Sequence, residues 1–361
     1  MFFSEIKVNY SNGEYPVRMY KDFHGLRLEL EKIPNVSRFI IISERSISQT
    51  YNKYIESELK GYSVPIDQIF IKGGEKNKHI SRMKRVFNEL IDLGADRKSV
   101  IIALGGGVVG DYSGFVAATY QRGIRFIQIP TTLLSCVDSS VGGKVAVNVD
   151  KGKNMVGAFH QPELVYIPMF ALSTLPEREW SCGLAEMLKH SLLAGGEMWQ
   201  DFKSHERKDI KVDSEILRKM ILDSIRFKAS VVAQDEKEGG IRQILNLGHT
   251  TAHAIESLTR YKKYSHGEAV AIGLITALIL SNKIGFSIDK VETVSRIMEK
   301  YNLPINDNSK PSDIIKHMQH DKKKVGNDLK FVLLEDIGKP KFAVTIHSKE
   351  ILSALKEQRK F

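Results

Sequence analysis

The stretch Ser99-Val100-Ile101-Ile102-Ala103-Leu104-Gly105-Gly106-Gly107-Val108-Val109-Gly110 indicates the fold of the first half of the chain. Its first six residues form an apolar, β-branched run that is typical of a buried strand, and the glycines follow it at once. A helix is expected to follow over Val109–Tyr120. Glycines after a parallel strand let backbone N–H groups approach a pyrophosphate, and the helix N-terminus favours its negative charge. Such turns are also common as plain connections, so this one alone only suggests a nucleotide site.

Strands and helices alternate on both sides of this stretch. A strand pair is predicted around the turn Asn12-Gly13, with Val17–Tyr20 as its second strand. The other predicted elements are strands at Arg38–Ser43, Gln68–Ile71, Phe126–Ile129 and Val165–Ile167, and helices at Ser48–Leu59 and Ile80–Leu93. This alternation predicts a Rossmann-like α/β domain, a parallel sheet with covering helices. Between the last two strands, Val137–Lys144 and Lys151–Asn154 are predicted to be polar turns.

From about Thr174 the pattern changes to long helical segments. They are predicted at Ile216–Gln234, Ile244–Leu258, Ala269–Ile284 and Asp289–Tyr301, after a helix that carries Gly183–His190. Lys330–Leu334 and Lys341–Val344 resemble the strands of a small hairpin. We therefore predict two domains: an α/β NAD-binding domain at 1–173 and a mostly α-helical metal and substrate domain at 174–361.

Three histidines lie close together in the predicted helical domain. His249 and His253 are four residues apart, so they project from one helix face, and His266 opens the next helix. With one carboxylate, such imidazoles match the ligand set of a catalytic zinc site. Glu186 in an apolar helix would complete the set with His249 and His266. His253 would then be either a group that supports the ligands or a proton-transfer group, rather than a ligand itself. The alternatives are ordinary core histidines and an ion pair between Glu186 and Lys189.

Cationic and amide side chains recur in polar, turn-like contexts. Each is expected to be a surface group if judged alone, but together they would suit a phosphorylated, carboxylated substrate. They are Lys144, Lys153, Lys189, Lys228, Arg242, Lys322 or Lys323, Asn154 and Asn246.

Composition limits the class of protein. The chain has 361 residues and a net charge of +10, yet its basic residues are not interleaved with aromatic ones as in nucleic-acid binders, so no nucleic-acid partner is expected. Its longest apolar run, Ala269–Leu280, is shorter than the roughly 20 residues of a membrane span. The start resembles no secretory signal, and Cys136 and Cys182 form no CxxC pattern. A cytoplasmic protein without a membrane partner is the natural interpretation.

At this point the chain closely resembles the 3-dehydroquinate synthase family. The matching runs occur in the family's order and spacing over roughly residues 70–335, and only their combination is specific. They are Gly105–Asp111 (GGGVVGD), Tyr120–Gly123 (YQRG), Pro130–Ser135 (PTTLLS), Val137–Lys144 (VDSSVGGK), Gly152–Met155 (GKNM), Gly183–Glu186 (GLAE), Asn246–Thr250 (NLGHT), His266–Glu268 (HGE) and Asp321–Lys323 (DKK).

The resemblance implies a fold, a reaction and two cofactors. It implies an active site between the two domains, with NAD+ and one divalent metal, Zn2+ or Co2+, held by Glu186, His249 and His266. The implied reaction converts 3-deoxy-D-arabino-heptulosonate 7-phosphate to 3-dehydroquinate and phosphate. It proceeds by transient oxidation at C5, loss of phosphate, reduction, ring opening and an intramolecular aldol closure.

It also implies roles for individual residues. Lys144, Asn154, Arg242, Asn246 and His253 match positions near the phosphate and hydroxyls, and Asp138, Lys189, Lys228 and one of Lys322 and Lys323 match positions that contact the carboxylate and ring hydroxyls. Arg122 matches an arginine that reaches the neighbouring subunit, so a homodimer is implied. Cofactor contacts are implied for Glu75, Lys78, Gly106, Gly107, Asp111, Thr131, Thr132, Lys153 and Thr174.

Some positions depart from the family pattern. Ser43-Glu44 stands where an Asp or Asn usually binds the adenine ribose, so Glu44 is the candidate for that contact. Thr251-Ala252 replaces a more usual Phe-Gly pair, and Met187–His190 is a variant helix ending. Two other enzyme classes share the plan: other sugar phosphate cyclases and metal-dependent polyol dehydrogenases. A binding module without catalysis would leave the ligand set without a purpose.

Overall fold

The computed structural model of the protein describes residues 1–286, 290–321 and 328–361. The chain divides into two compact units. The first unit comprises Met1–Leu175 and Lys228–Ala233, and the second comprises Pro176–Phe227 and Gln234–Phe361.

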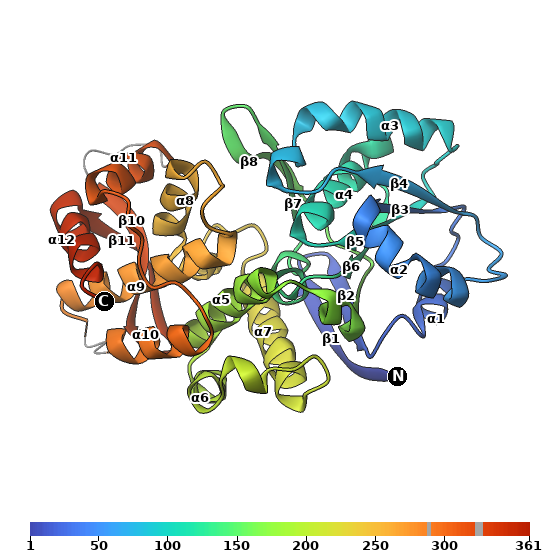
Figure 1. Cartoon of the computed structure of the whole chain (residues 1–361). Coiled ribbons are helices and arrows are strands. Elements are labelled where there is room, and N and C mark those ends of the chain that lie inside the picture. The colour runs from blue at the N-terminus through green and yellow to red at the C-terminus, as the bar shows by residue number, and fades with distance from the viewer. Residues whose placement is uncertain (287–289, 322–327) are drawn as a thin grey trace. The chain divides into compact units, whose positions relative to one another are not determined.

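The first unit is built on a twisted sheet. Among the described residues this sheet has seven strands, of which the β1–β2 pair is antiparallel and every other neighbouring pair is parallel. In spatial order they are β1 (Phe2–Tyr10), β2 (Gly13–Tyr20), β9 (Leu164–Pro168), β6 (Arg125–Pro130), β5 (Val100–Gly105), β3 (Phe39–Glu44) and β4 (Ile66–Ile71) (Figure 1). The predicted α/β fold with a parallel sheet is confirmed.

Helices cover both faces of the sheet, which explains the unbroken apolar runs of its central strands β3 and β5. Along β3, Ile40 and Ile42 pack with α3 (Met83–Asp92) and α4 (Gly107–Thr119) in one core cluster. Phe39 and Ile41 point to the opposite face, where α1 (Leu26–Glu31) and α2 (Arg45–Glu58) contribute to a second cluster (Figure 1). A strand buried on both faces has no polar side, so it is apolar at every position.

A hairpin after β6 was not predicted. Residues 140–142 and 151 of the expected polar turns are turns or bends, but most of the rest belongs to a π-helical turn at Ser135–Ser139 and to the antiparallel strands β7 (Lys144–Val149) and β8 (Gly152–Phe159). Val145 and Val147 are buried in the core cluster that includes α4. Valine at every second position, Val145, Val147 and Val149, was the missed signal, because the glycines around the hairpin resemble those of a loop.

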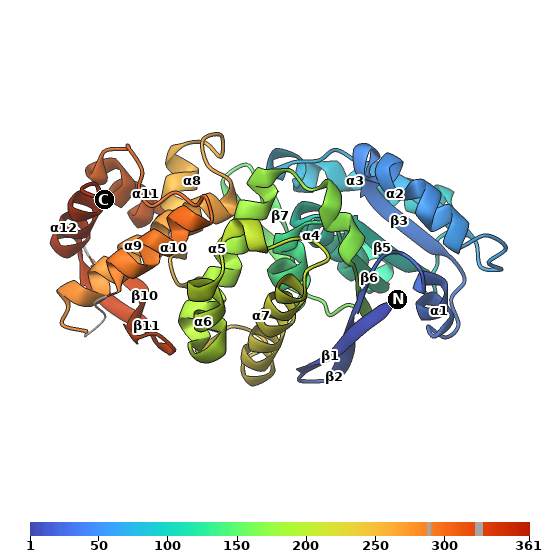
Figure 2. The same ribbon diagram turned by 60° about the horizontal axis from the view of Figure 1, so that its bottom comes forward.

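The second unit is mostly helical and is organised around α9 (His266–Lys283). Fourteen of its residues are buried, as expected for a helix that is apolar on all sides. Helices α5, α8, α10 and α12 and strand β10 contact it (Figure 2). The helices here are α5 (Glu177–Ala194), α6 (Gly196–Ser204), α7 (Glu215–Gln234, apart from Lys228–Ala233), α8 (His249–Leu258), α10 (Val291–Lys300), α11 (Pro311–Asp321) and α12 (Ser348–Gln358).

Two details of this unit bear on the sequence expectations. The predicted C-terminal hairpin is present as β10 (Asp328–Asp336) and β11 (Lys339–His347). The predicted continuous helix Ile244–Leu258 is wrong: a 3-10 turn at Ile241–Asn246 precedes α8, and Gly248 between them has φ +80°. Glycine adopts this left-handed conformation without a steric penalty, so the chain can change direction here before α8 begins. Across the described part of the chain, no helix is both long and apolar enough to cross a bilayer.

Candidate active site

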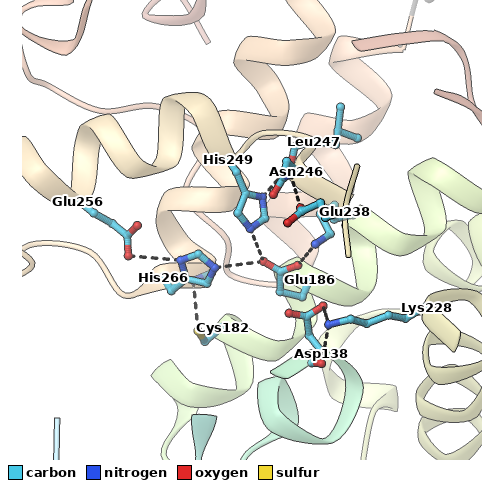
Figure 3. Close-up of polar contacts among 12 residues, drawn as sticks. Asp138, Cys182, Glu186, Lys228, Glu238, Asn246, Leu247, His249, Glu256 and His266 are labelled. Carbon is cyan, nitrogen blue, oxygen red and sulfur yellow. Dashed lines mark hydrogen bonds and ion pairs between the residues drawn. The ribbon is translucent and has the colours of Figure 1, made fainter. Parts of the chain in front are cut away.

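Glu186, His249 and His266 converge inside the second unit. Glu186 Oε1 lies 3.7 Å from His249 Nε2 and 3.5 Å from His266 Nε2 (Figure 3). The Glu186 side chain is fully buried, and within the described residues neither of its oxygens makes a hydrogen bond, although Oε2 forms an ion pair with Lys189. A tetrahedral ion with bonds of about 2.0–2.1 Å holds its ligand atoms roughly 3.3 Å apart. The three side chains therefore fit a divalent metal.

Helix starts place both imidazoles. His249 is the first residue of α8, after Gly248, and His266 is the first residue of α9, after the N-cap Ser265. Ser265 and Glu268 form a capping box, in which the Ser265 N–H donates to Glu268 Oε2 at 2.6 Å. Such reciprocal bonds fix the start of a helix, and here they fix the direction of His266.

Helix α9 also packs unusually closely on α5. The Gly267 N–H donates to Cys182 Sγ at 3.2 Å, and a Cβ on Gly267 would lie 2.3 Å from the Cys182 carbonyl oxygen. Cys182 precedes Glu186 by one helical turn, so this close contact sets the spacing between Glu186 and His266. Burial raises the pKa of the Cys182 thiol to about 12, which keeps it protonated.

The electrostatics favour neutral imidazole in the cluster. Burial, and then the nearby positive charge of Lys189, lower the pKa of His249 well below its usual value of 6.5. The positive end of a helix dipole opposes an imidazolium in the same direction. A neutral imidazole offers its lone pair to a cation, so His249 is prepared for a metal at neutral pH.

His253 stands beside this cluster but is not one of its three ligand groups. Its ring centroid lies 5.5 Å from that of His249 and 6.4 Å from that of His266. Glu186, His249 and His266 form a cluster whose ligand atoms all lie within 4.8 Å of one another, and His253 is not part of it. Such a place suits a group that acts on a bound substrate.

The segment before α8 supplies two further predicted residues. Arg242 is 1% exposed, and its guanidinium donates to the Glu236 carbonyl. The Asn246 side chain donates to Glu238 Oε1 at 2.8 Å, and Leu247 next to it turns its carbonyl oxygen to His249 Nδ1 at 3.2 Å (Figure 3). Glu238 was not singled out from the sequence, because an acidic residue in a polar loop carries no distinctive spacing.

The first unit gathers most of the predicted cofactor positions at the carboxyl ends of its strands. Gly106 is the N-cap of α4 and Gly107 its first residue, and Lys78, which is 3% exposed, forms an ion pair of 2.5 Å with Asp111. A Cβ on Gly107 would lie 2.9 Å from Ser139 Oγ, so a larger residue would crowd the start of α4. The other predicted cofactor positions have polar partners or are buried. Glu75 Oε1 accepts a hydrogen bond from Asn148 at 2.8 Å. The hydroxyls of Thr132 and Thr174 contact those of Ser135 and Tyr51, and Thr131 is buried.

Glu44 ends β3, and its carboxylate lies directly over Gly73, where a Cβ would be 1.8 Å from Oε2. Its neighbour Arg45 lines a cavity of about 300 Å3 together with Phe70, Asn77 and Tyr112, among others.

The remaining predicted residues of the first unit lie on and around the β7–β8 hairpin, in the turn after α4 and within α7. Lys228 Nζ donates to the Asp138 side chain at 2.7 Å and to its carbonyl at 2.6 Å (Figure 3). Lys144 is exposed, Lys153 is half-buried, and Asn154 has φ +56° with its N–H bonded to Asn148 at 2.8 Å. Arg122 is exposed in a turn after α4. Lys322 and Lys323 lie outside the described residues.

Fold and site together define a class: an α/β unit with a glycine-rich helix start, joined to a helical unit with a two-histidine, one-glutamate cluster. A structure of 2-deoxy-scyllo-inosose synthase with carbaglucose-6-phosphate, NAD+ and Co2+ matches at TM-score 0.87 and 27% identity, covering 98% of this chain and 100% of that chain. Glycerol dehydrogenase from Schizosaccharomyces pombe matches at TM-score 0.68 and 13% identity, over 99% and 92% of the two chains, which shows a shared fold.

Sequence comparison narrows the class to one family. Residues 68–182 match the 3-dehydroquinate synthase N-terminal family and residues 183–324 its C-terminal counterpart. The 3-dehydroquinate synthase of Leptospira interrogans serogroup Icterohaemorrhagiae serovar copenhageni (strain Fiocruz L1-130) is 57% identical over 356 residues, which cover 98% of each chain. That of Desulforamulus reducens (strain ATCC BAA-1160 / DSM 100696 / MI-1) is 40% identical over 98% of this chain and 99% of its own. The chain belongs to the 3-dehydroquinate synthase family, and the resemblance inferred from its motifs is confirmed.

Proposed function

We propose that this chain is a 3-dehydroquinate synthase, a carbon–oxygen lyase that acts on a phosphate ester. It converts 3-deoxy-D-arabino-heptulosonate 7-phosphate to 3-dehydroquinate and phosphate, a step of the shikimate pathway to chorismate and the aromatic amino acids. The observation that carries this proposal is the 57% identity to a 3-dehydroquinate synthase over 98% of both chains. The buried cluster of Glu186, His249 and His266 agrees with it.

The proposed cofactors are NAD+ and one divalent metal, Zn2+ or Co2+. When bound, the metal polarises substrate oxygens and NAD+ accepts and returns a hydride, so no net reductant is formed. Glu186, His249 and His266 would hold the metal. Around NAD+, the α4 N-terminus at Gly106 and Gly107 would face the pyrophosphate, with Glu75, Lys78, Asp111, Thr131, Thr132, Lys153 and Thr174 around it. Glu44, at the end of β3, would accept a hydrogen bond from the adenine ribose.

The proposed substrate contacts follow the charges of the substrate. Lys144, Asn154, Arg242 and Asn246 would bind the phosphate and nearby hydroxyls, and His253 would hold or move a proton there. The burial of Arg242 leaves its guanidinium with little competing water, which strengthens a charged hydrogen bond. Asp138, Lys189, Lys228 and one of Lys322 and Lys323 would contact the carboxylate and ring hydroxyls. The Lys228–Asp138 pair keeps both side chains oriented before substrate arrives.

A homodimer in the cytoplasm completes the proposal. Arg122, exposed in its turn, would reach the neighbouring subunit's phosphate site. Both cysteines are buried free thiols, which suits a reducing compartment.

Phosphate release from 3-deoxy-D-arabino-heptulosonate 7-phosphate tests the activity. With catalytic NAD+ we expect release that EDTA abolishes and that added zinc or cobalt restores, without NADH accumulation. Released phosphate is measured with a coupled enzyme assay, and NADH is measured by its absorbance.

Two results would overturn the proposal. Stoichiometric NADH from a simple polyol, without phosphate release, would make the chain a dehydrogenase. Inactivity with this substrate but cyclisation of sedoheptulose 7-phosphate would make it another sugar phosphate cyclase.

A further inference from the structure

Glu256 is a buried carboxylate directly behind the metal-binding cluster. It lies seven residues after His249 on α8, and therefore on the same helix face two turns later. Glu256 is 3% exposed, and its Oε1 lies 3.3 Å from His266 Nδ1 (Figure 3). Burial of a carboxylate is costly unless it is paired, so this contact requires an explanation.

The two ring nitrogens of His266 face different partners. Nε2 faces Glu186 Oε1 at 3.5 Å, within the candidate metal cluster, while Nδ1 faces Glu256. If Nδ1 carries the proton and donates it to Glu256, the Nε2 lone pair is directed into the cluster.

His249 has a similar arrangement with a weaker partner. Its Nδ1 lies 3.2 Å from the Leu247 carbonyl oxygen, which is neutral. A carboxylate acceptor polarises an imidazole more than a carbonyl does and raises the basicity of the opposite nitrogen. The two histidines of the cluster therefore differ in the charge behind them.

We propose that Glu256 is a positioning residue that fixes the tautomer and direction of His266 and strengthens its bond to the metal. This inference rests on the proposed metal site and deepens it. The competing explanation is structural. Glu256 would only stabilise the connection between α8 and α9, because its partner His266 is the first residue of α9. The two explanations predict different effects on metal affinity.

The test is metal affinity of the purified full-length protein with Glu256→Gln and Glu256→Ala. Apoprotein is titrated with Zn2+ against a chromophoric chelator, and with Co2+ while the visible d–d bands are recorded. We expect about 10-fold weaker binding for Glu256→Gln and up to about 100-fold for Glu256→Ala, with altered Co2+ bands. Gln keeps the shape and an acceptor oxygen but removes the charge, so the apoprotein's thermal midpoint should change little.

Asp307→Asn is the matched control. Asp307 is also a buried carboxylate of the second unit, and it binds Lys263, in the same connecting segment, at 2.6 Å. This substitution should lower the stability of the protein. The metal affinity should stay within about twofold of that of the unaltered protein, because Asp307 pairs with Lys263 and not with an imidazole.

The outcomes are distinguishable. Unchanged affinity in Glu256→Gln, or an equal loss in Asp307→Asn, would overturn the positioning role while leaving the metal site intact. If the unaltered protein itself binds neither Zn2+ nor Co2+, the proposed function fails first.

Discussion

At the scale of single residues, the structure assigns different places to His249 and His253, which the sequence puts one helical turn apart. His249 Nε2 points to the buried Glu186 carboxylate, whereas His253 lies outside the set of three ligand groups. We expect His249→Ala to lose bound metal and activity together. His253→Ala should keep its metal and lose about 10²–10⁴-fold in kcat, the usual contribution of a proton-transfer group.

Metal analysis of the dialysed proteins, alongside kcat, checks this pair. Full metal content and activity in His249→Ala would show that Glu186, His249 and His266 do not share an ion. Metal loss in His253→Ala would make it a ligand.

His160 gives a pH prediction in the first unit. Its ring stacks on Phe126 at 5.2 Å, its Nε2 lies 2.8 Å from the Ile124 carbonyl, and burial lowers its pKa below 6.5. Because the folded pKa is depressed, the unfolded chain binds more protons below pH 6.5. The contribution of neutral His160 to stability is therefore complete above that pH and is lost as the pH falls.

Urea unfolding between about pH 7 and 5 measures this effect. The unfolding free energy should fall less steeply with acid in His160→Gln, which cannot take up the proton, than in the unaltered protein. Parallel pH profiles would contradict the assignment.

The sequence predicted site residues where spacing or chemistry is distinctive. His249 and His266 stood out because histidines are rare and close in sequence, and Glu186 because it interrupts an apolar helix. Glu256 and Glu238 did not, since glutamates are common and their partners are apparent only in three dimensions. Glu256 had a usable signal: it follows His253 by three residues and so lies on the same helix face.

At the scale of elements, the crossing of α5 and α9 sets the candidate metal site. A Cβ on Gly267 would lie 2.5 Å from Cys182 Cα and 2.3 Å from its carbonyl oxygen, both backbone atoms that cannot rotate away. Gly267→Ala must therefore separate the helix carrying His266 from the one carrying Glu186. We expect a loss of about 1–3 kcal/mol in stability, the usual cost of overpacking, and weaker metal binding. Thermal unfolding of apoprotein and the chelator titration measure the two effects.

Gly239→Ala is the control for this substitution. Gly239 lies in the same unit, has no positive φ, and a Cβ there would meet nothing within 4 Å. Its replacement by alanine should leave the stability of the apoprotein and its metal affinity nearly unchanged. If Gly267→Ala behaves like Gly239→Ala, the close helix contact does not determine the site.

Element prediction succeeded where full burial gives a long apolar run. The central strands β3 and β5 and the apolar helix α9 were predicted within a few residues. The break at Gly248 was missed because apolar residues continue on both sides of it, and the closeness of Gly248 to the backbone of Leu274 arises only in tertiary structure. The 2.9 Å between a Gly248 Cβ and Leu274 N leaves no room for a side chain there.

At the scale of the whole molecule, the proposed homodimer makes a further prediction. Gln121, Arg122 and Gly123 have φ of +49°, +70° and +117°, so consecutive residues adopt the left-handed region, and Arg122 is exposed. Such a conformation is uncommon outside glycine and costs free energy at Gln121 and Arg122. Arg122 is exposed at this turn, and the dimer proposal assigns it to the phosphate site of the neighbouring subunit.

Complementation between two inactive variants tests this directly. Arg122→Ala keeps its metal ligands, and His249→Ala keeps Arg122, so a differently tagged heterodimer would contain one complete site of two. In a closed two-fold dimer we expect each homodimer to be nearly inactive and the heterodimer to regain about half of the unaltered activity. An inactive heterodimer would mean that Arg122 serves its own subunit, because both sites would then carry a defect. A protein that sediments as a fully active monomer would remove the dimer from the proposal altogether.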